Sequence, residues 1–212
     1  MEIIEVVKAT KKFKEVIVLN NITVSFAAGK IHGIIGRNGS GKTVLMRLIC
    51  GLLRLTEGEI RVRGKIVGKD IDMPPDIGIV IEHPGFLPTF SGFRNLQYLA
   101  KVRNIIGRDQ ICESIRLVGL DPESKKHVSK YSMGMRQRLA IAQAIMENPD
   151  ILILDEPMNG LDKDGVIEIR EIIKKLKEQG KTILLASHNP LDITELCDTI
   201  YEMDGGSITK LK

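Results

Sequence analysis

The chain has 212 residues, a formal net charge of +4, and 43% hydrophobic and 27% charged residues. This composition is typical of a globular protein, and the length allows one large domain or two lobes sharing a core. No apolar run approaches the roughly 18 residues of a membrane-spanning helix, and the amino terminus lacks a signal-peptide pattern.

Residues 2–35 have apolar side chains at alternating positions, which predicts short strands separated by turns. These positions are Ile4, Val6, Val16, Val18, Ile22, Val24 and Phe26. Residues 28–30 read as a turn before a strand that starts at Ile31. Basic residues cluster at 8–14 and again at 125–130, but few aromatic residues accompany them. We therefore expect solvated surface there and no nucleic-acid partner.

The octapeptide GRNGSGKT, residues 36–43, fits the pattern G-x-x-x-x-G-K-[ST], which wraps nucleotide phosphates. It follows an apolar strand and opens a helix-like stretch, 44–53, which is the context this motif requires. The glycines let successive N–H groups point at anionic oxygens, and the helix starting near Lys42 adds its positive end. We expect Lys42 to reach the β- and γ-phosphates and Thr43 to ligate Mg²⁺.

The pattern of apolar residues changes after residue 53. Residues 59–67 predict a β-hairpin and 77–81 a strand, whereas 91–148 have helical periodicity interrupted by Gly107, Gly119 and Pro122. Further on, residues 151–154 read as a strand buried on both faces. A helix over 165–179, a strand over 182–186, a short helix after Pro190 and a strand pair over 199–210 complete the α/β pattern.

Three scattered cysteines, Cys50, Cys112 and Cys197, form no C-x-x-C motif. Their number is odd, so the sequence predicts reduced thiols packed as small hydrophobic side chains, as in a cytosolic protein.

Two carboxylates, Asp155 and Glu156, follow the buried strand 151–154. Ligands bind at the carboxyl ends of strands in open α/β sheets. Asp155 is placed to hold Mg²⁺ opposite Thr43, and Glu156 to orient or deprotonate an attacking water. His188 follows the next apolar strand and could bridge the γ-phosphate and that water, although a lone histidine is more often structural.

The segment 131–139, YSMGMRQRL, starts a helix at Ser132, a favourable N-cap residue, and Gly134 allows close backbone approach. A helix N-terminus attracts anions. The segment is distant in sequence from the phosphate loop, so it need not contact the same nucleotide. By physics alone, a plain capped helix without a binding role stays an alternative.

In order and content these motifs resemble the nucleotide-binding subunit of an ATP-binding cassette (ABC) transporter, over essentially the whole chain. The resemblance implies an α/β fold: a P-loop NTPase (RecA-like) core with an N-terminal antiparallel β subdomain and an inserted α-helical subdomain. It implies a single ABC ATPase domain over 1–212, with the core in 1–83 and 149–212 and the helical subdomain in 84–148.

The resemblance also assigns roles to residues. The nucleotide-binding set is Phe13 (on adenine, where Tyr is usual), Gly36, Arg37, Asn38, Gly39, Ser40, Gly41, Lys42, Thr43 and Val44. The catalytic set is Glu156, His188 and Lys42, and the metal set Thr43, Asp155 and Glu82. Residues 159–162 match the D-loop, with Asp162 as its acid. The family signature matches Ser132, Met133, Gly134 and Met135, which are expected to act on a second subunit's nucleotide.

Two departures from the family pattern stand out. Met133 and Met135 replace a Gly and a Gln of the signature, while Ser132 and Gly134 are kept. Glu82 occupies the usual position of the Q-loop glutamine, which adds negative charge near the γ-phosphate and a group that titrates. Both departures resemble the branch that exports, or confers immunity to, peptide antibiotics such as lantibiotics and bacitracin.

The resemblance therefore implies an ATP-hydrolysing subunit that uses ATP and Mg²⁺ and forms a homodimer or heterodimer around ATP. It implies separately encoded membrane subunits and a place on the cytoplasmic face of the cell membrane. A soluble, non-transport ABC-type ATPase is the alternative, and a non-cassette phosphate-loop kinase a third. The apolar residues Phe86, Leu87, Phe90 and Phe93 either receive the membrane subunits or pack the helical lobe onto the core.

Overall fold

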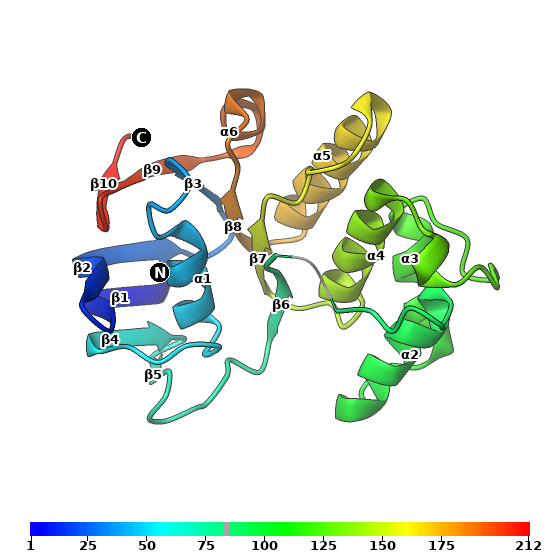
Figure 1. The fold of residues 1–212 in the computed structure, drawn as a ribbon, viewed down its shortest axis with the longest axis horizontal. Helices are drawn as coiled ribbons and strands as arrows, with labels where there is room; N and C mark the ends of the chain where they lie inside the picture. Colours follow the sequence, from blue (N-terminus) through cyan, green and yellow to red (C-terminus); the bar gives the residue numbers. More distant parts are fainter. Residues whose placement is uncertain (83–84) are drawn as a thin grey trace.

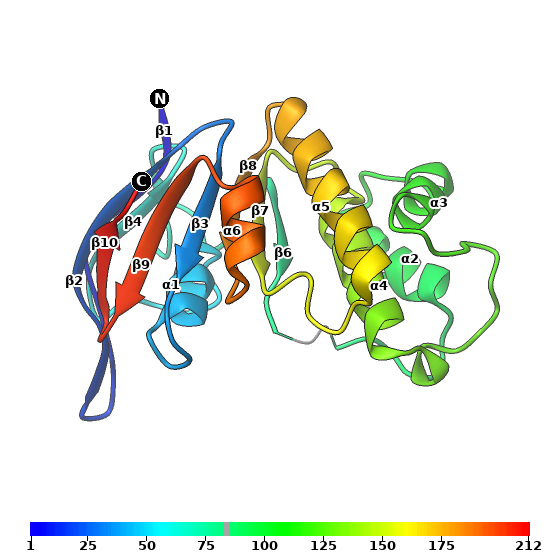
Figure 2. The same ribbon diagram turned by 90° about the horizontal axis from the view of Figure 1, so that it is seen from above.

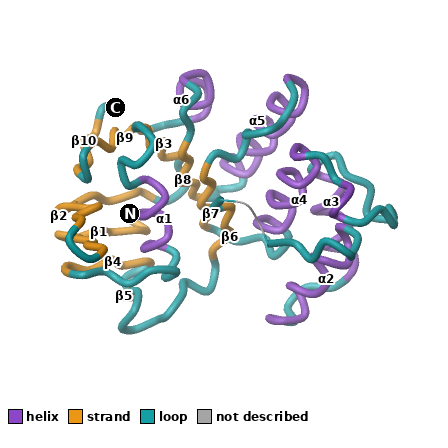
Figure 3. The backbone as a smooth tube through the Cα atoms, in the orientation of Figure 1, coloured by secondary structure: helices purple, strands orange, loops and turns teal. Residues whose placement is uncertain are grey.

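The computed structural model describes residues 1–82 and 85–212. Two sheets form its framework, one of strand order β2-β1-β4-β5 and one of order β10-β9-β3-β8-β7-β6. Figures 1 and 3 show the strand-rich half on the left and helices α2, α3 and α4 together on the right. The mixed α/β fold expected from the sequence is confirmed.

The smaller sheet is antiparallel. It contains β1 (Glu2–Phe13), β2 (Val16–Ala27), β4 (Glu57–Val62) and β5 (Lys65–Ile66). The prediction of several short strands is wrong here, because β1 and β2 form one long hairpin. The ladder stays continuous through register shifts, which displace the apolar alternation along β1.

The larger sheet contains β3 (Ile31–Ile35), β6 (Ile77–Val80), β7 (Ile151–Asp155), β8 (Thr182–Ala186), β9 (Thr199–Asp204) and β10 (Ser207–Lys210). Among the described ladders of this sheet, only the β9–β10 pair is antiparallel; β3, β6, β7, β8 and β9 run parallel. The carboxyl ends of β3, β6, β7 and β8 therefore lie along one edge of the sheet.

Two hydrophobic cores meet at the parallel strands. Ile151 and Ile153 pack with α1 (Lys42–Ile49) and the antiparallel sheet, whereas Leu152 and Leu154 pack with the other helices. Figures 1 and 2 accordingly show α5 (Lys163–Glu178) and α6 (Pro190–Leu196) on one side of these strands and α1 on the other. The prediction of a strand buried on both faces is confirmed.

The segment with helical periodicity forms α2 (Gly92–Arg103), α3 (Arg108–Leu117) and α4 (Met133–Ile145). The predicted start of a helical subdomain at residue 84 lies outside the described residues. The helix expected over 44–53 is α1, which ends earlier, at Ile49, because Gly51 adopts a left-handed φ of 78°. All three cysteines are buried free thiols, as expected.

Candidate functional site

The phosphate loop joins β3 to α1 and depends on glycine at two places. Gly36 and Gly41 have φ of 148° and 104°. A Cβ on Gly36 would lie 2.3 Å from Met203 O, and one on Gly41 would lie 2.7 Å from Leu19 Cδ2. The loop therefore curls tightly against β9 and β2, where no larger residue fits.

Inside this loop the polar groups fit an anion. Ser40 is 6% exposed, and among the described residues its Oγ is the buried side-chain atom without a hydrogen-bond partner. Lys42 is 8% exposed and its Nζ donates to Gly36 O at 2.7 Å and Arg37 O at 3.1 Å. An unpaired hydroxyl and an ammonium group within one cradle suit phosphate oxygens.

The hydroxyl of Thr43 at the start of α1 meets the carboxylate of Asp155 at the end of β7. Thr43 Oγ1 donates to Asp155 Oδ2 at 2.5 Å. These are hard oxygen donors of the kind that Mg²⁺ prefers together with phosphate oxygens. Among the described residues no group of three or more His, Cys, Asp and Glu side chains could hold a metal ion.

Glu156 and His188 meet at the ends of the neighbouring strands β7 and β8. His188 Nδ1 lies 2.8 Å from Glu156 Oε2, and Nδ1 carries the proton because a carboxylate only accepts. Glu156 N also donates to Ala186 O at 3.0 Å. The backbone of Glu156 is left-handed, with φ of 52°, so its side chain leaves the line of the strand.

Glu82, directly after β6, also has a left-handed backbone, with φ of 58°. Its Oε2 lies 2.5 Å from Arg47 Nη2 of α1. The extra negative charge expected at this position is therefore countered by a cation that sequence reasoning did not identify. No local pattern links the two residues.

A cavity of about 590 Å³ connects these groups. Its lining is Val18, residues 38–44, Glu82, Met133, Gln137, Asp155, Glu156 and Asn159. Predicted site residues that do not appear in this lining, as far as the chain is described, are Phe13, Gly36, Arg37, Ser132, Gly134, Met135, Asp162 and His188. Phe13 is 42% exposed, and Lys11 Nζ lies 4.6 Å from its ring centroid.

The segment 131–139, which contains the family signature, lies at the start of α4 and packs on the segment after β7. Ser132 caps α4 by accepting from Met135 N at 3.1 Å. A Cβ on Gly134 would lie 3.0 Å from Gly160 O, and one on Gly160 would lie 2.6 Å from Met133 Cγ. A Cβ at Gly134 would therefore require a small shift of the Gly160 backbone, and one at Gly160 a shift of Met133.

Two further side chains fix the segment after β7. Gln137 Nε2 donates to Pro157 O at 3.0 Å, which ties α4 to the residues that follow Glu156. Asp162 caps α5 by accepting from Gly165 N at 3.0 Å. Gln137 belongs to the signature string, but only the fold reveals its contact.

Comparison with known proteins gives consistent results. The sequence profile of the ABC transporter family matches residues 19–159. The chain is 46% identical over 205 residues to the uncharacterized ABC transporter ATP-binding protein YybJ of Bacillus subtilis, covering 97% of this chain and 94% of YybJ. It is 41% identical over 210 residues to the bacitracin transport ATP-binding protein BcrA of Enterococcus faecalis, covering 98% and 68%. It is 35% identical over 198 residues to the lantibiotic transport ATP-binding protein SrtF of Streptococcus pyogenes, covering 93% and 85%.

Solved structures agree on the fold. The dimeric structure of the bacterial ABC transporter cassette MJ0796 superposes with a TM-score of 0.87 at 26% identity, over 99% of both chains. A post-hydrolysis state of MJ0796 with ADP and phosphate gives the same TM-score at 24% identity, also over 99% of both chains. None of the helices in the described part of this chain is long and apolar enough to cross a membrane. The chain belongs to the ABC transporter family, as an ATP-binding and ATP-hydrolysing cassette.

Proposed function

We propose that the chain binds ATP in the cavity at the carboxyl edge of the parallel sheet and hydrolyses it there through Glu156. The observation that carries this assignment is the contact of Glu156 with His188 at 2.8 Å, beside a phosphate-fitting loop. Glu156 accepts a proton from the attacking water, and His188 holds the Glu156 carboxylate in position.

Several other predicted residues are proposed to contact the nucleotide or its metal ion. Lys42 moves from the loop carbonyls onto the β- and γ-phosphates, and the N–H groups of residues 36–43 hold the same oxygens. Mg²⁺, when bound by Thr43 and Asp155, would neutralise charge on the phosphate oxygens. Phe13 stacks on the adenine from the end of β1.

The site is completed by a second chain. Ser132 and Gly134 lie at the N-terminus of α4, and Ser132 is exposed, so its end of the helix is open to an anion. Met133 and Met135 flank this surface. We propose that the start of α4 contacts the nucleotide of a partner cassette in a homodimer or heterodimer, and that Asp162 lies at that interface. The dimeric structures of MJ0796 support such an arrangement.

The transported molecule is an antimicrobial peptide or drug, exported or excluded through separately encoded membrane subunits. The names of BcrA and SrtF, transport proteins for bacitracin and a lantibiotic, support this proposal. Glu82 in place of glutamine and the string YSMGM point to the same branch. The chain would then work on the cytoplasmic face of the membrane.

Glu156→Gln tests the hydrolytic role. The amide keeps the shape of the side chain but cannot accept the water's proton, so turnover should fall by about 100-fold or more while ATP affinity stays within about twofold. Phosphate release and a fluorescent-nucleotide titration measure the two quantities. Sizing with ATP should show a dimer of the variant. Normal turnover would refute the role of Glu156.

The transport proposal needs a separate test in the host cell. Removing the gene should raise sensitivity to one peptide antibiotic, and restoring the unaltered gene should reverse this, while the Glu156→Gln gene should not. Unchanged sensitivity to bacitracin, lantibiotics and related peptides would contradict the proposed substrate. That result would not contradict the proposed ATPase activity.

A further inference from the structure

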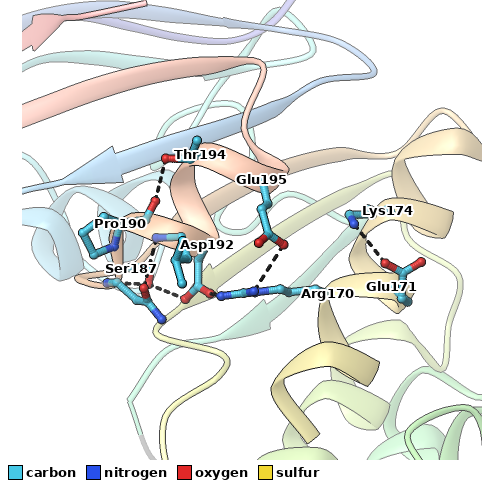
Figure 4. Close-up of polar contacts among 10 residues, drawn as sticks. Arg170, Glu171, Lys174, Ser187, Pro190, Asp192, Thr194 and Glu195 are labelled. Carbon is cyan, nitrogen blue, oxygen red and sulfur yellow. Dashed lines mark hydrogen bonds and ion pairs between the residues drawn. The ribbon is translucent and has the colours of Figure 1, made fainter. Parts of the chain in front are cut away.

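The turn that carries His188 rests on a buried polar network between α5 and α6, drawn in Figure 4. Asp192 is 2% exposed, Ser187 is 2% exposed and Arg170 is 9% exposed. Asp192 Oδ1 accepts from Arg170 Nε at 2.9 Å and from Nη2 at 2.6 Å. Asp192 Oδ2 accepts from Ser187 Oγ at 2.7 Å, so both oxygens of the buried carboxylate are paired.

A buried ion pair is weak evidence for stability, because desolvation offsets most of the attraction. The Arg170–Asp192 pair instead fixes the orientation of the Asp192 carboxylate. The two donors of Arg170 occupy one oxygen of Asp192 and leave the other facing Ser187. A pair of apolar side chains would pack α5 on α6 without fixing the orientation of a polar group.

The network reaches the residues on both sides of His188. Ser187 Oγ accepts from Asn189 N at 3.1 Å, and Asn189 Oδ1 accepts from Leu191 N at 3.0 Å, which caps α6. The His188 side chain itself is 67% exposed, and the hydrogen bond that its ring makes within the described residues is the one to Glu156. Apart from this hydrogen bond, the direction of the imidazole therefore depends on the backbone of the turn.

The same helix pair is also connected to the strand that carries Glu156. α5 follows the segment after β7 and is capped by Asp162 at its start. Arg170 lies on this helix, and Asp192 lies on the helix that follows His188. The network thus joins the two chain segments whose side chains meet at Glu156 and His188.

We propose that Arg170, Asp192 and Ser187 are positioning residues that aim His188 Nδ1 at the Glu156 carboxylate. The consequence for turnover rests on the proposed roles of Glu156 and His188 in hydrolysis. The expected change in the orientation of the His188 ring does not depend on those roles.

Ser187→Ala is the sharpest variant, because it removes one hydroxyl and leaves the Arg170–Asp192 pair between the helices. Ser187→Thr keeps the hydroxyl and serves as the rescue. Asp192→Asn removes the buried charge. Glu171→Gln is the matched control, since Glu171 is an exposed carboxylate on α5 that pairs with Lys174 at 2.9 Å.

The first readout is the ¹⁵N signal of the His188 ring in the nucleotide-free chain. The chain has 4 histidines, so the signal can be assigned by comparison with His188→Gln. The unaltered chain, Ser187→Thr and Glu171→Gln should show a hydrogen-bonded Nδ1. In Ser187→Ala and Asp192→Asn the signal should move toward that of a free imidazole.

The second readout is single-turnover hydrolysis of ATP by the whole chain at high protein concentration. Ser187→Ala should lower the rate by about tenfold to 100-fold, because a misplaced catalytic group costs this much, with ATP affinity unchanged. Ser187→Thr should restore most of the rate.

An unchanged His188 signal in a folded Ser187→Ala chain would overturn the proposal and leave the network as helix packing. A shifted signal with normal turnover would support the positioning of His188 but refute its role in hydrolysis. Circular dichroism confirms that each variant is folded. If Asp192→Asn does not fold, the comparison of Ser187→Ala with Ser187→Thr still decides.

Discussion

Single residues at the site are held in conformations that they would not adopt alone. Glu156 and Glu82 both have left-handed backbones, which cost a side chain of this type about 1–3 kcal/mol. Glu156 gains a bond from its N–H to Ala186 O and a partner in His188. Glu82 gains Arg47. The surrounding contacts, rather than intrinsic preference, keep both carboxylates facing the cavity.

The Arg47–Glu82 pair predicts an effect on ATP affinity. Arg47→Met leaves the Glu82 charge uncompensated beside the phosphates, so ATP binding should weaken by about two- to fivefold, a modest change because both side chains are partly exposed. Arg47→Met combined with Glu82→Gln should restore affinity. A nucleotide titration measures this. Arg54→Met, which breaks the exposed Arg54–Asp72 pair, is the control; equal losses in Arg54→Met and Arg47→Met would contradict the prediction.

His32 predicts a pH dependence of stability. It is 1% exposed; Nε2 donates to Ala27 O, and Nδ1 accepts from Thr199 Oγ1. Burial lowers its pKa below the usual 6.5. The unfolded chain then binds the proton more readily, so stability is full above about pH 6.5 and falls below it, by at most about 1.4 kcal/mol per pH unit.

Urea unfolding at pH 8 and pH 5.5 measures this contribution. His32→Gln should reduce the difference between the two pH values, whereas His127→Gln, at an exposed position, should leave it as it was. A pH dependence that is the same in all three chains would show that His32 does not cause it.

At the scale of elements, the sequence predicted the bounds of strands most accurately where all residues of the strand are buried. The strands 182–186 and 151–154 were predicted almost to the residue, because each is buried throughout, apolar apart from Thr182, and followed by polar residues. The long β1–β2 hairpin was missed because its register shifts break the alternation. Gln137–Pro157, Arg47–Glu82 and Arg170–Asp192 join residues distant in sequence, so no local pattern contains them.

The apolar residues before and within α2 now separate into two groups. Phe86 and Phe93 pack against the core, as one of the two sequence interpretations held. Leu87 is 46% exposed, and Tyr98 is 54% exposed and stacks on Phe90 at 5.4 Å. We expect Leu87 and Tyr98 to belong to a surface that docks the proposed membrane subunits.

Leu87→Ser and Tyr98→Ser should therefore lower the fraction of chain recovered with membranes of its host severalfold. Leu87→Ser should change the free energy of unfolding by no more than about 0.5 kcal/mol, because an exposed side chain contributes little. Tyr98→Ser should lower it by about 1 kcal/mol, because it also removes the stacking on Phe90. Phe93→Ser should instead destabilise the fold by about 2 kcal/mol or more. Full membrane recovery of the first two variants would contradict the docking surface.

At the scale of the whole molecule, the proposed function places ATP between the cavity of one chain and the exposed Ser132 at the start of α4 of a second chain. If ATP is held between two chains, the specific ATPase activity should rise with protein concentration, because dimerisation limits turnover at low concentration. A serial dilution of the chain at saturating Mg-ATP measures this. Constant specific activity would contradict the two-chain site.

A mixing experiment provides the control. Lys42→Ala disables phosphate binding, and Ser132→Arg blocks the start of α4, so each chain alone should be inactive. Mixed together they should regain activity, since a mixed dimer contains one intact site built from both chains. An inactive mixture of folded chains would place Ser132 outside the site.

The strand order also dictates when this protein acquires its function during synthesis. β3, which leads into the phosphate loop, lies between β8 and β9, and both of these come from the last part of the chain. On the ribosome β3 therefore stays without its two neighbouring strands until residue 204, the end of β9, has emerged. A nascent chain stalled before Thr182 has every residue of GRNGSGKT but lacks β8 and β9, the two strands that flank β3. We therefore expect nucleotide to bind, and to favour folding, only once β8 and β9 have been synthesised.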